Sequence, residues 1–294
     1  MTRPTLARTL RTAHARRAFS IGAAPHARLE PASALAGKAH ADLDLYGVNV
    51  LVLDRPAARN ALSVQMVHEM REALDRIAAD QDARIAIVHS TSGVFCAGAD
   101  LRERKGMSPS EVEAFLNNLN DMVSDLEALG IPTIAAVPGP ALGGGTELAL
   151  GADLRTGEAK TAFVLPETKL GIIPGAGGTQ RLTKLVGVAK SLELIYTGRR
   201  VEVAEAERLG LLNAVAKDGA TAFDAALDLS TQILTSAPLS LRAAKRAIKA
   251  APYLDIKDGL KYERAAYEPL LSSEDRNEGL RAFAEKRKPQ FQGR

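Results

Sequence analysis

The sequence predicts an α/β core of parallel, buried strands followed by a C-terminal region of helices. From about residue 42, short apolar runs alternate with stretches of helical periodicity, which is the pattern of successive β–α units. The strand candidates are almost continuously apolar, as strands covered on both faces are. After about residue 186, strand signals become scarce while helical stretches continue.

The core elements follow from apolar runs, helical offsets and breakers. Residues 48–53 form the first strand candidate, which ends before Pro56. A helix follows, which Ser63 is placed to cap, because apolar residues recur at offsets of four, four and three. These residues are Met66, Met70, Leu74 and Ile77. The next candidates are a strand at 85–89, a helix at about 110–129 and a strand at 134–137.

The C-terminal third is predicted to be mostly helical. The helical stretches are 188–196, 204–209, 223–234, 239–250, 256–271 and a last one before Pro289. No internal repeat or low-complexity linker separates these parts. We therefore expect a core over residues 42–230 and a helical region over residues 231–294.

Composition excludes several classes of protein. The chain has 294 residues, 46% apolar and 25% charged, close to the average for soluble globular proteins. Cys96 is the single cysteine, so a disulfide framework is excluded, and the five histidines show no zinc-ligand spacing. No stretch approaches the ~20 apolar residues that span a bilayer. We expect a soluble protein without a structural metal.

The N-terminal 29 residues differ from the rest of the chain. They contain six Arg and no Asp or Glu, with Thr and Ser interspersed. This composition predicts a mitochondrial presequence that is disordered and cleaved; a disordered cytosolic tail is the alternative. Without these residues the chain has 32 basic and 35 acidic residues, so the formal charge of +3 is no nucleic-acid signal.

Three segments of small residues stand beside predicted strands and helices. They cover residues 95–100, residues 141–148 and residues 166–181. Glycine there leaves backbone N–H groups uncovered, and a helix N-terminus favours negative charge. Taken singly, such a run can be an ordinary turn, and Glu147 can be a surface residue early in a helix. No Lys-Ser or Lys-Thr follows, which excludes a P-loop, and a dinucleotide fingerprint is also disfavoured.

Together these segments resemble, in order and spacing, the signatures of the crotonase (enoyl-CoA hydratase/isomerase) superfamily. The resemblance extends from about residue 48 to 292 and also includes residues 59–62. The motifs are Ala97-Gly98-Ala99-Asp100-Leu101, Ala141-Leu142-Gly143-Gly144-Gly145-x-Glu147-Leu148, Pro166-Glu167 and Pro174-Gly175-x-Gly177-Gly178-Thr179-Gln180-Arg181. The implied fold is a spiral of ββα units closed by a C-terminal helical region, assembled as homotrimers or hexamers.

The resemblance implies acyl-CoA thioester substrates and a set of site residues. Backbone N–H groups of Ala99 and Gly144 would form an oxyanion hole for the enolate-like transition state. Glu147 would act as base on water and Glu167 as acid, with the Gly175 amide helping to fix the water. No metal and no redox cofactor is implied, since CoA is part of the substrate. Cys96 is expected to pack under the oxyanion loop.

Further residues are expected to bind the CoA part of the substrate. They are Arg59, Ala61, Asp100, Leu101, Arg102, Pro174, Gly175, Phe283 and Lys286. Phe283 and Lys286 resemble residues that reach the nucleotide of a bound CoA. That CoA is expected either in the same subunit or in a neighbouring one. For any one of them, a solvated surface position is the alternative.

The presence of both glutamates favours a hydratase over an isomerase. Within the superfamily the motifs look most like the methylglutaconyl-CoA hydratase branch, which acts in leucine breakdown, and a presequence suits the mitochondrial matrix. The alternative is a short-chain enoyl-CoA hydratase of fatty-acid β-oxidation. Because a methylglutaconyl chain ends in a carboxylate, its pocket should hold a cation or several donors, and the sequence alone does not show which residue that is.

Members of that branch also bind AU-rich RNA through a lysine-rich stretch after the first long helix. RNA affinity depends on clustered basic residues. The corresponding residues 78–84 contain two acids and one base here. We therefore do not expect RNA as a partner.

Overall fold

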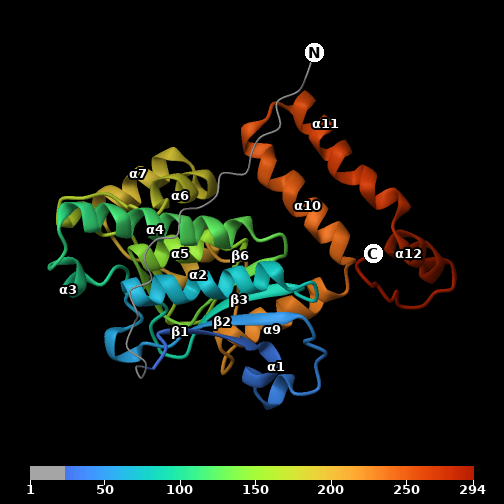
Figure 1. Ribbon diagram of the computed structural model, residues 1–294, viewed down its shortest axis with the longest axis horizontal. Helices are drawn as coiled ribbons and strands as arrows, with labels where there is room; N and C mark the ends of the chain where they lie inside the picture. The colour runs from blue at the N-terminus through green and yellow to red at the C-terminus, as the bar shows by residue number, and fades with distance from the viewer. Residues whose placement is uncertain (1–23) are drawn as a thin grey trace.

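The computed structural model describes residues 24–294 (Figure 1). Within them, a main sheet has six strands in the order β1-β2-β3-β4-β6-β9, parallel except that β1 runs antiparallel to β2. These strands are β1 (Ala27–Pro31), β2 (Val48–Leu53), β3 (Ile85–Ser90), β4 (Thr133–Val137), β6 (Leu154–Gly157) and β9 (Ala214–Val215). A small sheet consists of β5 (Pro140–Leu142), β7 (Ala162–Val164) and β8 (Val201–Glu202).

Helices cover both faces of the main sheet, so its central strands β2, β3 and β4 are buried on both sides (Figure 1). Side chains alternate along the strands: Leu51 and Val88 belong to the hydrophobic core on one face of the sheet, whereas Val50 and Ile87 belong to the core on the other face. The helices of this part are α1 (Ala32–Leu35), α2 (Val64–Ala79), α3 (Leu101–Arg104), α4 (Pro109–Ala128), α5 (Gly144–Gly151), α6 (Gly178–Val186), α7 (Val188–Thr197), α8 (Val203–Arg208) and α9 (Ala222–Leu234). The predicted α/β class is confirmed.

The helix starts that flank the sheet are fixed by local chemistry. Ser63 caps α2, as predicted, and its hydroxyl accepts the Met66 N–H at 3.1 Å. Helix α4 begins with Pro109 after a capping box, in which Ser108 and Glu111 satisfy each other's backbone N–H groups. The predicted elements at 48–53, 85–89, 110–129 and 134–137 agree with β2, β3, α4 and β4 to within one or two residues.

The expected boundary after residue 29 is wrong, because it falls inside a strand. Residues 1–23 of the expected presequence lie outside the described residues, but residues 27–31 form β1 and pair with β2. Arg28, one of the basic residues that suggested a presequence, forms ion pairs with Glu30 and Asp54. These partners lie outside the acid-free segment, so its composition could not reveal them. The core also begins before the expected residue 42.

The C-terminal boundary also differs from the expected one. Residue 230 lies within α9, whose Phe223, Ala226 and Leu227 pack under β2, β3 and β4. The helical region therefore begins after α9 and consists of α10 (Pro238–Ala250), α11 (Ile256–Tyr267) and α12 (Glu274–Ala284), with short 3-10 turns between them. It extends away from the sheet (Figure 1). None of the helices in residues 24–294 has the length and apolar character to cross a membrane.

Candidate active site

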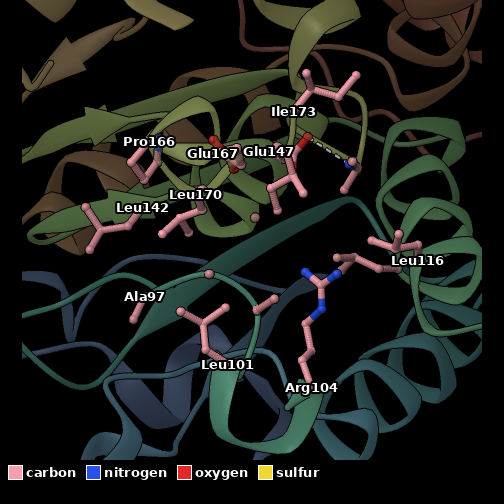
Figure 2. A pocket seen from close by; sticks show the side chains of 18 residues that line it. Ala97, Leu101, Arg104, Leu116, Leu142, Glu147, Pro166, Glu167, Leu170 and Ile173 are labelled. Atoms are coloured by element: carbon pink, nitrogen blue, oxygen red, sulfur yellow. Dashed lines mark hydrogen bonds between the residues drawn. The ribbon is translucent and has the colours of Figure 1, made fainter. Parts of the chain in front are cut away.

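A cavity of about 560 Å³ lies where α3, α4, the start of α5 and the loops after β7 meet (Figure 2). Most of its lining comes from the same three small-residue segments that the sequence singled out, and the rest comes from α3 and α4. The lining is largely apolar, with contributions from Leu101, Leu116, Leu142 and Ile173. Two carboxylates, those of Glu147 and Glu167, also line it.

Two backbone segments approach each other closely at one edge of the cavity. Gly98 has φ +85°, and a Cβ there would lie 2.7 Å from the Leu142 carbonyl oxygen, so only glycine fits. A Cβ on Gly144 would lie 3.6 Å from the Ala99 nitrogen, which places the two segments side by side. Within residues 24–294, the N–H groups of Ala99 and Gly144 donate to no acceptor. Both are therefore available to an oxygen in the cavity.

Glu147 lies in the first turn of α5 and is buried, with 2% of its surface exposed. Its Oε1 accepts hydrogen bonds from the Ala176 and Gly178 N–H groups, both at 2.7 Å. Burial raises the pKa of Glu147, and these two backbone donors oppose the rise because they stabilise the ionised form. A Cβ on Gly178 would lie 3.0 Å from Oε1, so a bare glycine lets the loop reach the carboxylate.

The loop that donates to Glu147 is itself braced from two sides. The Asn120 side chain donates to the Gly175 carbonyl at 2.8 Å, and Arg181 donates to the Ala176 carbonyl at 2.8 Å. Arg181 also forms a 2.8 Å ion pair with Glu127 of α4. The loop that holds the carboxylate of Glu147 is therefore itself supported by side chains of α4 and α6.

Glu167 begins the 3-10 turn after Pro166 and faces the same cavity as Glu147 (Figure 2). Its Oε2 is buried without a hydrogen-bond partner among the described residues. Burial raises the pKa of Glu167 to about 7, although a hydrogen bond to its own backbone opposes the rise; the negative charge of Glu147 adds a smaller upward contribution. At neutral pH this carboxyl can carry a proton and release it.

The site thus brings together two free backbone N–H groups, one buried carboxylate held by N–H donors and one carboxyl poised to donate a proton. Such donors stabilise negative charge that develops on a carbonyl oxygen. A pair of carboxyls with different environments can serve as base and acid in one reaction. The arrangement fits proton-transfer chemistry next to a carbonyl group.

Comparison with known proteins agrees with this site. Residues 45–294 match the family described as enoyl-CoA hydratase/isomerase. The chain belongs to this family. It is 48% identical over 248 residues to the probable enoyl-CoA hydratase 2, mitochondrial, of Arabidopsis thaliana, covering 84% of this chain and 82% of that protein. It is 41% identical over 258 residues to the mouse methylglutaconyl-CoA hydratase, mitochondrial, covering 86% and 82%.

Solved structures of family members share the fold. The crystal structure of enoyl-CoA hydratase from Bacillus anthracis superimposes with a TM-score of 0.82 at 40% identity, covering 85% of this chain and 96% of that one. The predicted crotonase fold, an α/β core followed by C-terminal helices, is therefore confirmed.

The structure places the residues expected to bind CoA at several locations. Leu101 and Gly175 line the cavity, whereas Arg59, Ala61, Arg102 and Pro174 do not. Arg59 has φ +51° and accepts the Ala97 N–H through its carbonyl oxygen, so it supports the loop that precedes the oxyanion segment. Their contacts with CoA stay predictions.

Asp100 stabilises the start of α3. Its carboxylate caps α3 by accepting the Arg102 and Glu103 N–H groups, and it forms a 2.7 Å ion pair with Arg55. These contacts hold the pKa of Asp100 below its usual range against the opposing effect of burial.

Phe283 lies in the last turn of α12 and Lys286 follows two residues after the helix ends; neither lines this chain's cavity. Phe283 is 86% exposed. Cys96 is fully buried beneath the oxyanion segment, where its sulfur accepts the Gly98 N–H at 3.4 Å. Burial raises the pKa of Cys96 to about 12, which makes the thiol a packing group and a poor nucleophile.

Sequence reasoning missed one charged residue of the cavity, Arg104. It lies on α3 three residues after Leu101, so the two share one face of the helical turn. Leu116, on the apolar face of α4, was missed as well. The sequence did contain a signal for Arg104. It follows Leu101 by three residues in the helical turn that Asp100 caps, so a cavity lined by Leu101 would also be reached by Arg104.

Proposed function

We propose that this chain is a hydratase that adds water across the α,β double bond of an enoyl-CoA thioester. The observation that carries the proposal is the convergence of Glu147, Glu167 and the free N–H groups of Ala99 and Gly144 on one cavity. A cavity of this size accepts an acyl group but not a whole CoA, so the nucleotide part would extend outside it.

In the proposed mechanism, the thioester oxygen accepts hydrogen bonds from the Ala99 and Gly144 N–H groups. Glu147 removes a proton from water, and the resulting hydroxide forms a bond to C3. Electron density moves onto the thioester oxygen, where each fixed donor is worth about 3–4 kcal/mol. Glu167 then donates its proton to C2 as the enolate collapses. No metal or redox step is needed, because the reaction changes no net oxidation state.

We propose 3-methylglutaconyl-CoA as the substrate and the mitochondrial matrix as the location. The relative named methylglutaconyl-CoA hydratase, mitochondrial, supports both, and the basic N-terminal composition supports the location. A turnover comparison between 3-methylglutaconyl-CoA, crotonyl-CoA and a longer enoyl-CoA tests the substrate. A preference for either of the other two would overturn this assignment within the hydratase class.

The catalytic assignment is tested by Glu147→Gln and Glu167→Gln. Each substitution keeps the shape of the side chain and removes its proton-transfer function, so we expect hydration to fall by about 10²–10⁴-fold. Binding of a saturated acyl-CoA, measured by calorimetry, should persist in both variants. Glu207→Gln, at an exposed position on α8, is the matched control. Unchanged turnover in either catalytic variant would refute the mechanism.

A further inference from the structure

Among the described residues, Arg104 is the one cationic residue that lines the cavity of Glu147 and Glu167. It is the last residue of α3 and is half-buried. Figure 2 shows its guanidinium directed into the cavity from the side formed by α3 and α4, facing the side that carries the two carboxyls. The proposed mechanism has no use for a cation at this position.

The guanidinium of Arg104 has no partner in residues 24–294: it forms no hydrogen bond and no ion pair there. The two acids on the same turn are already engaged. Asp100 pairs with Arg55 at 2.7 Å and caps α3, while Glu103 accepts the Val64 N–H at 2.9 Å.

The surroundings of Arg104 are apolar. Leu101, Leu116 and Ile173 line the cavity with it, and Figure 2 shows Leu116 beside the guanidinium. A charge that is partly withdrawn from water is unfavourable unless an opposite charge pairs with it. Arginine presents a planar fork of donors that matches a carboxylate with two parallel hydrogen bonds. The cavity is therefore complementary to an acyl group that carries an anion.

We infer that Arg104 is a specificity-determining residue that binds a carboxylate at the far end of the acyl chain. This inference rests on the proposed hydratase function, because that function places the thioester carbonyl at Ala99 and Gly144 and the double bond between the two glutamates. The remainder of the acyl chain then lies in the cavity that Arg104 lines. A CoA phosphate is the other anion that could reach an arginine, and the test below separates the two.

Binding measurements on Arg104→Met provide a test that needs no turnover. Glutaryl-CoA and valeryl-CoA form a matched pair, since a carboxylate in the first replaces a methyl group in the second. We expect Arg104→Met to weaken glutaryl-CoA binding by about 10- to 100-fold, the range for a lost charge-assisted pair, and to leave valeryl-CoA binding within about twofold. Arg104→Lys keeps the charge and should recover part of the loss.

Equal weakening of both ligands would overturn the inference, because it would assign Arg104 to the CoA moiety. Unchanged binding of both would overturn it as well. Lys105→Met, an exposed neighbour outside the cavity, is the control and should leave both ligands unaffected. A thermal unfolding midpoint close to that of the wild type verifies that Arg104→Met is folded.

Kinetics then distinguish this inference from the proposed function. With 3-methylglutaconyl-CoA, Arg104→Met should lower kcat/KM by about 10- to 100-fold, chiefly through KM, while 3-methylpent-2-enoyl-CoA is hydrated as by the wild type. If the wild-type protein hydrates neither substrate, the proposed function fails, and the binding experiment still decides the role of Arg104. If it hydrates both and the variant shows no selective loss, the inference about Arg104 fails and the hydratase stands.

Discussion

Glu147 and Glu167 are both buried, yet their surroundings differ in hydrogen bonding. Glu147 receives two backbone N–H donors at 2.7 Å, whereas Oε2 of Glu167 has no partner among the described residues. Donors stabilise the ionised form, so Glu147 is the better candidate for the base. Glu167, with its pKa raised to about 7, is the better candidate for the acid. The structure therefore gives a physical reason for the division of roles that the resemblance implied.

The raised pKa of Glu167 predicts a pH-dependent cost in stability. An unfolded glutamate titrates near 4.5, and the folded one near 7, so the folded state binds more protons between these values. Stability therefore falls as pH rises from about 4.5 to about 7, and above that range the ionised carboxylate lies buried without a partner. Glu167→Gln should be more stable than the wild type by about 1–3 kcal/mol at pH 8.5, given ~1.4 kcal/mol per pKa unit.

Chemical or thermal unfolding at pH 8.5 and at pH 4.5 measures this difference. The advantage of Glu167→Gln should shrink towards zero at pH 4.5, where the folded wild-type carboxyl is protonated and the unfolded one is about half protonated. Glu207→Gln, at an exposed position that does not line the cavity, should show no such pH dependence. A variant that is less stable than the wild type at pH 8.5 would contradict the assigned burial penalty.

At the scale of elements, the start of α5 depends on a close crossing of two backbone segments. A Cβ on Gly145 would lie 2.3 Å from the Cys96 carbonyl oxygen, which is backbone and cannot rotate away. Cys96 also pairs with Ala141 in an isolated β-bridge, and the Leu142 N–H donates to the Cys96 carbonyl oxygen at 2.9 Å. Gly145 therefore sets the spacing between the two segments that carry the free N–H groups.

Gly145→Ala should accordingly damage both stability and activity. We expect a loss of about 1–3 kcal/mol, the usual range for overpacking, because either α5 or the Cys96 segment must shift. The shift displaces the Gly144 N–H, so kcat/KM should fall at least about tenfold. Unfolding curves and hydration kinetics measure the two effects. Gly130→Ala, at a position with open space and no positive φ, should leave both within error.

The sequence predicted the long elements well because their signals are local. The offsets between Met66 and Ile77 and the apolar run at 48–53 report burial directly, and α2 and β2 formed where expected. Strands β8 and β9 lie in the region where strand signals were scarce, and each has two residues. Their pairing depends on partners far along the chain, which periodicity cannot show.

In the candidate site, too, some residues could be predicted from the sequence and others could not. The family resemblance implied roles for Glu147, Glu167, Ala99 and Gly144, which line one cavity, because the motifs that carry the resemblance can be compared in a linear sequence. The orientation of a surface cation is not visible there. Arg102 and Arg104 have similar local sequence, yet Arg104 lines the cavity and Arg102 does not. Only the three-dimensional position of α3 relative to the cavity distinguishes them.

At the scale of the whole molecule, the C-terminal arm, residues 238–294, presents unusual apolar surface. Ile256, Leu260 and Tyr267 form a stripe along α11 at helical spacing and are 79%, 56% and 50% exposed. The arm contacts the core through α10, where Lys245 forms a 2.7 Å ion pair with Asp153. Apolar faces of this kind mark interaction sites in soluble proteins.

We expect the arm to pack against a second copy of this chain in a homotrimer or hexamer, as the resemblance implies. Such an assembly would cover the α11 stripe and could bring Phe283 and Lys286 to a neighbour's substrate. Sedimentation of the purified protein should give three or six times the chain mass, and Leu260→Asp should shift it towards monomer, because a buried carboxylate opposes association. Lys257→Gln, on the adjacent exposed face, should leave the assembly intact. A monomeric wild type would show that the arm serves another purpose.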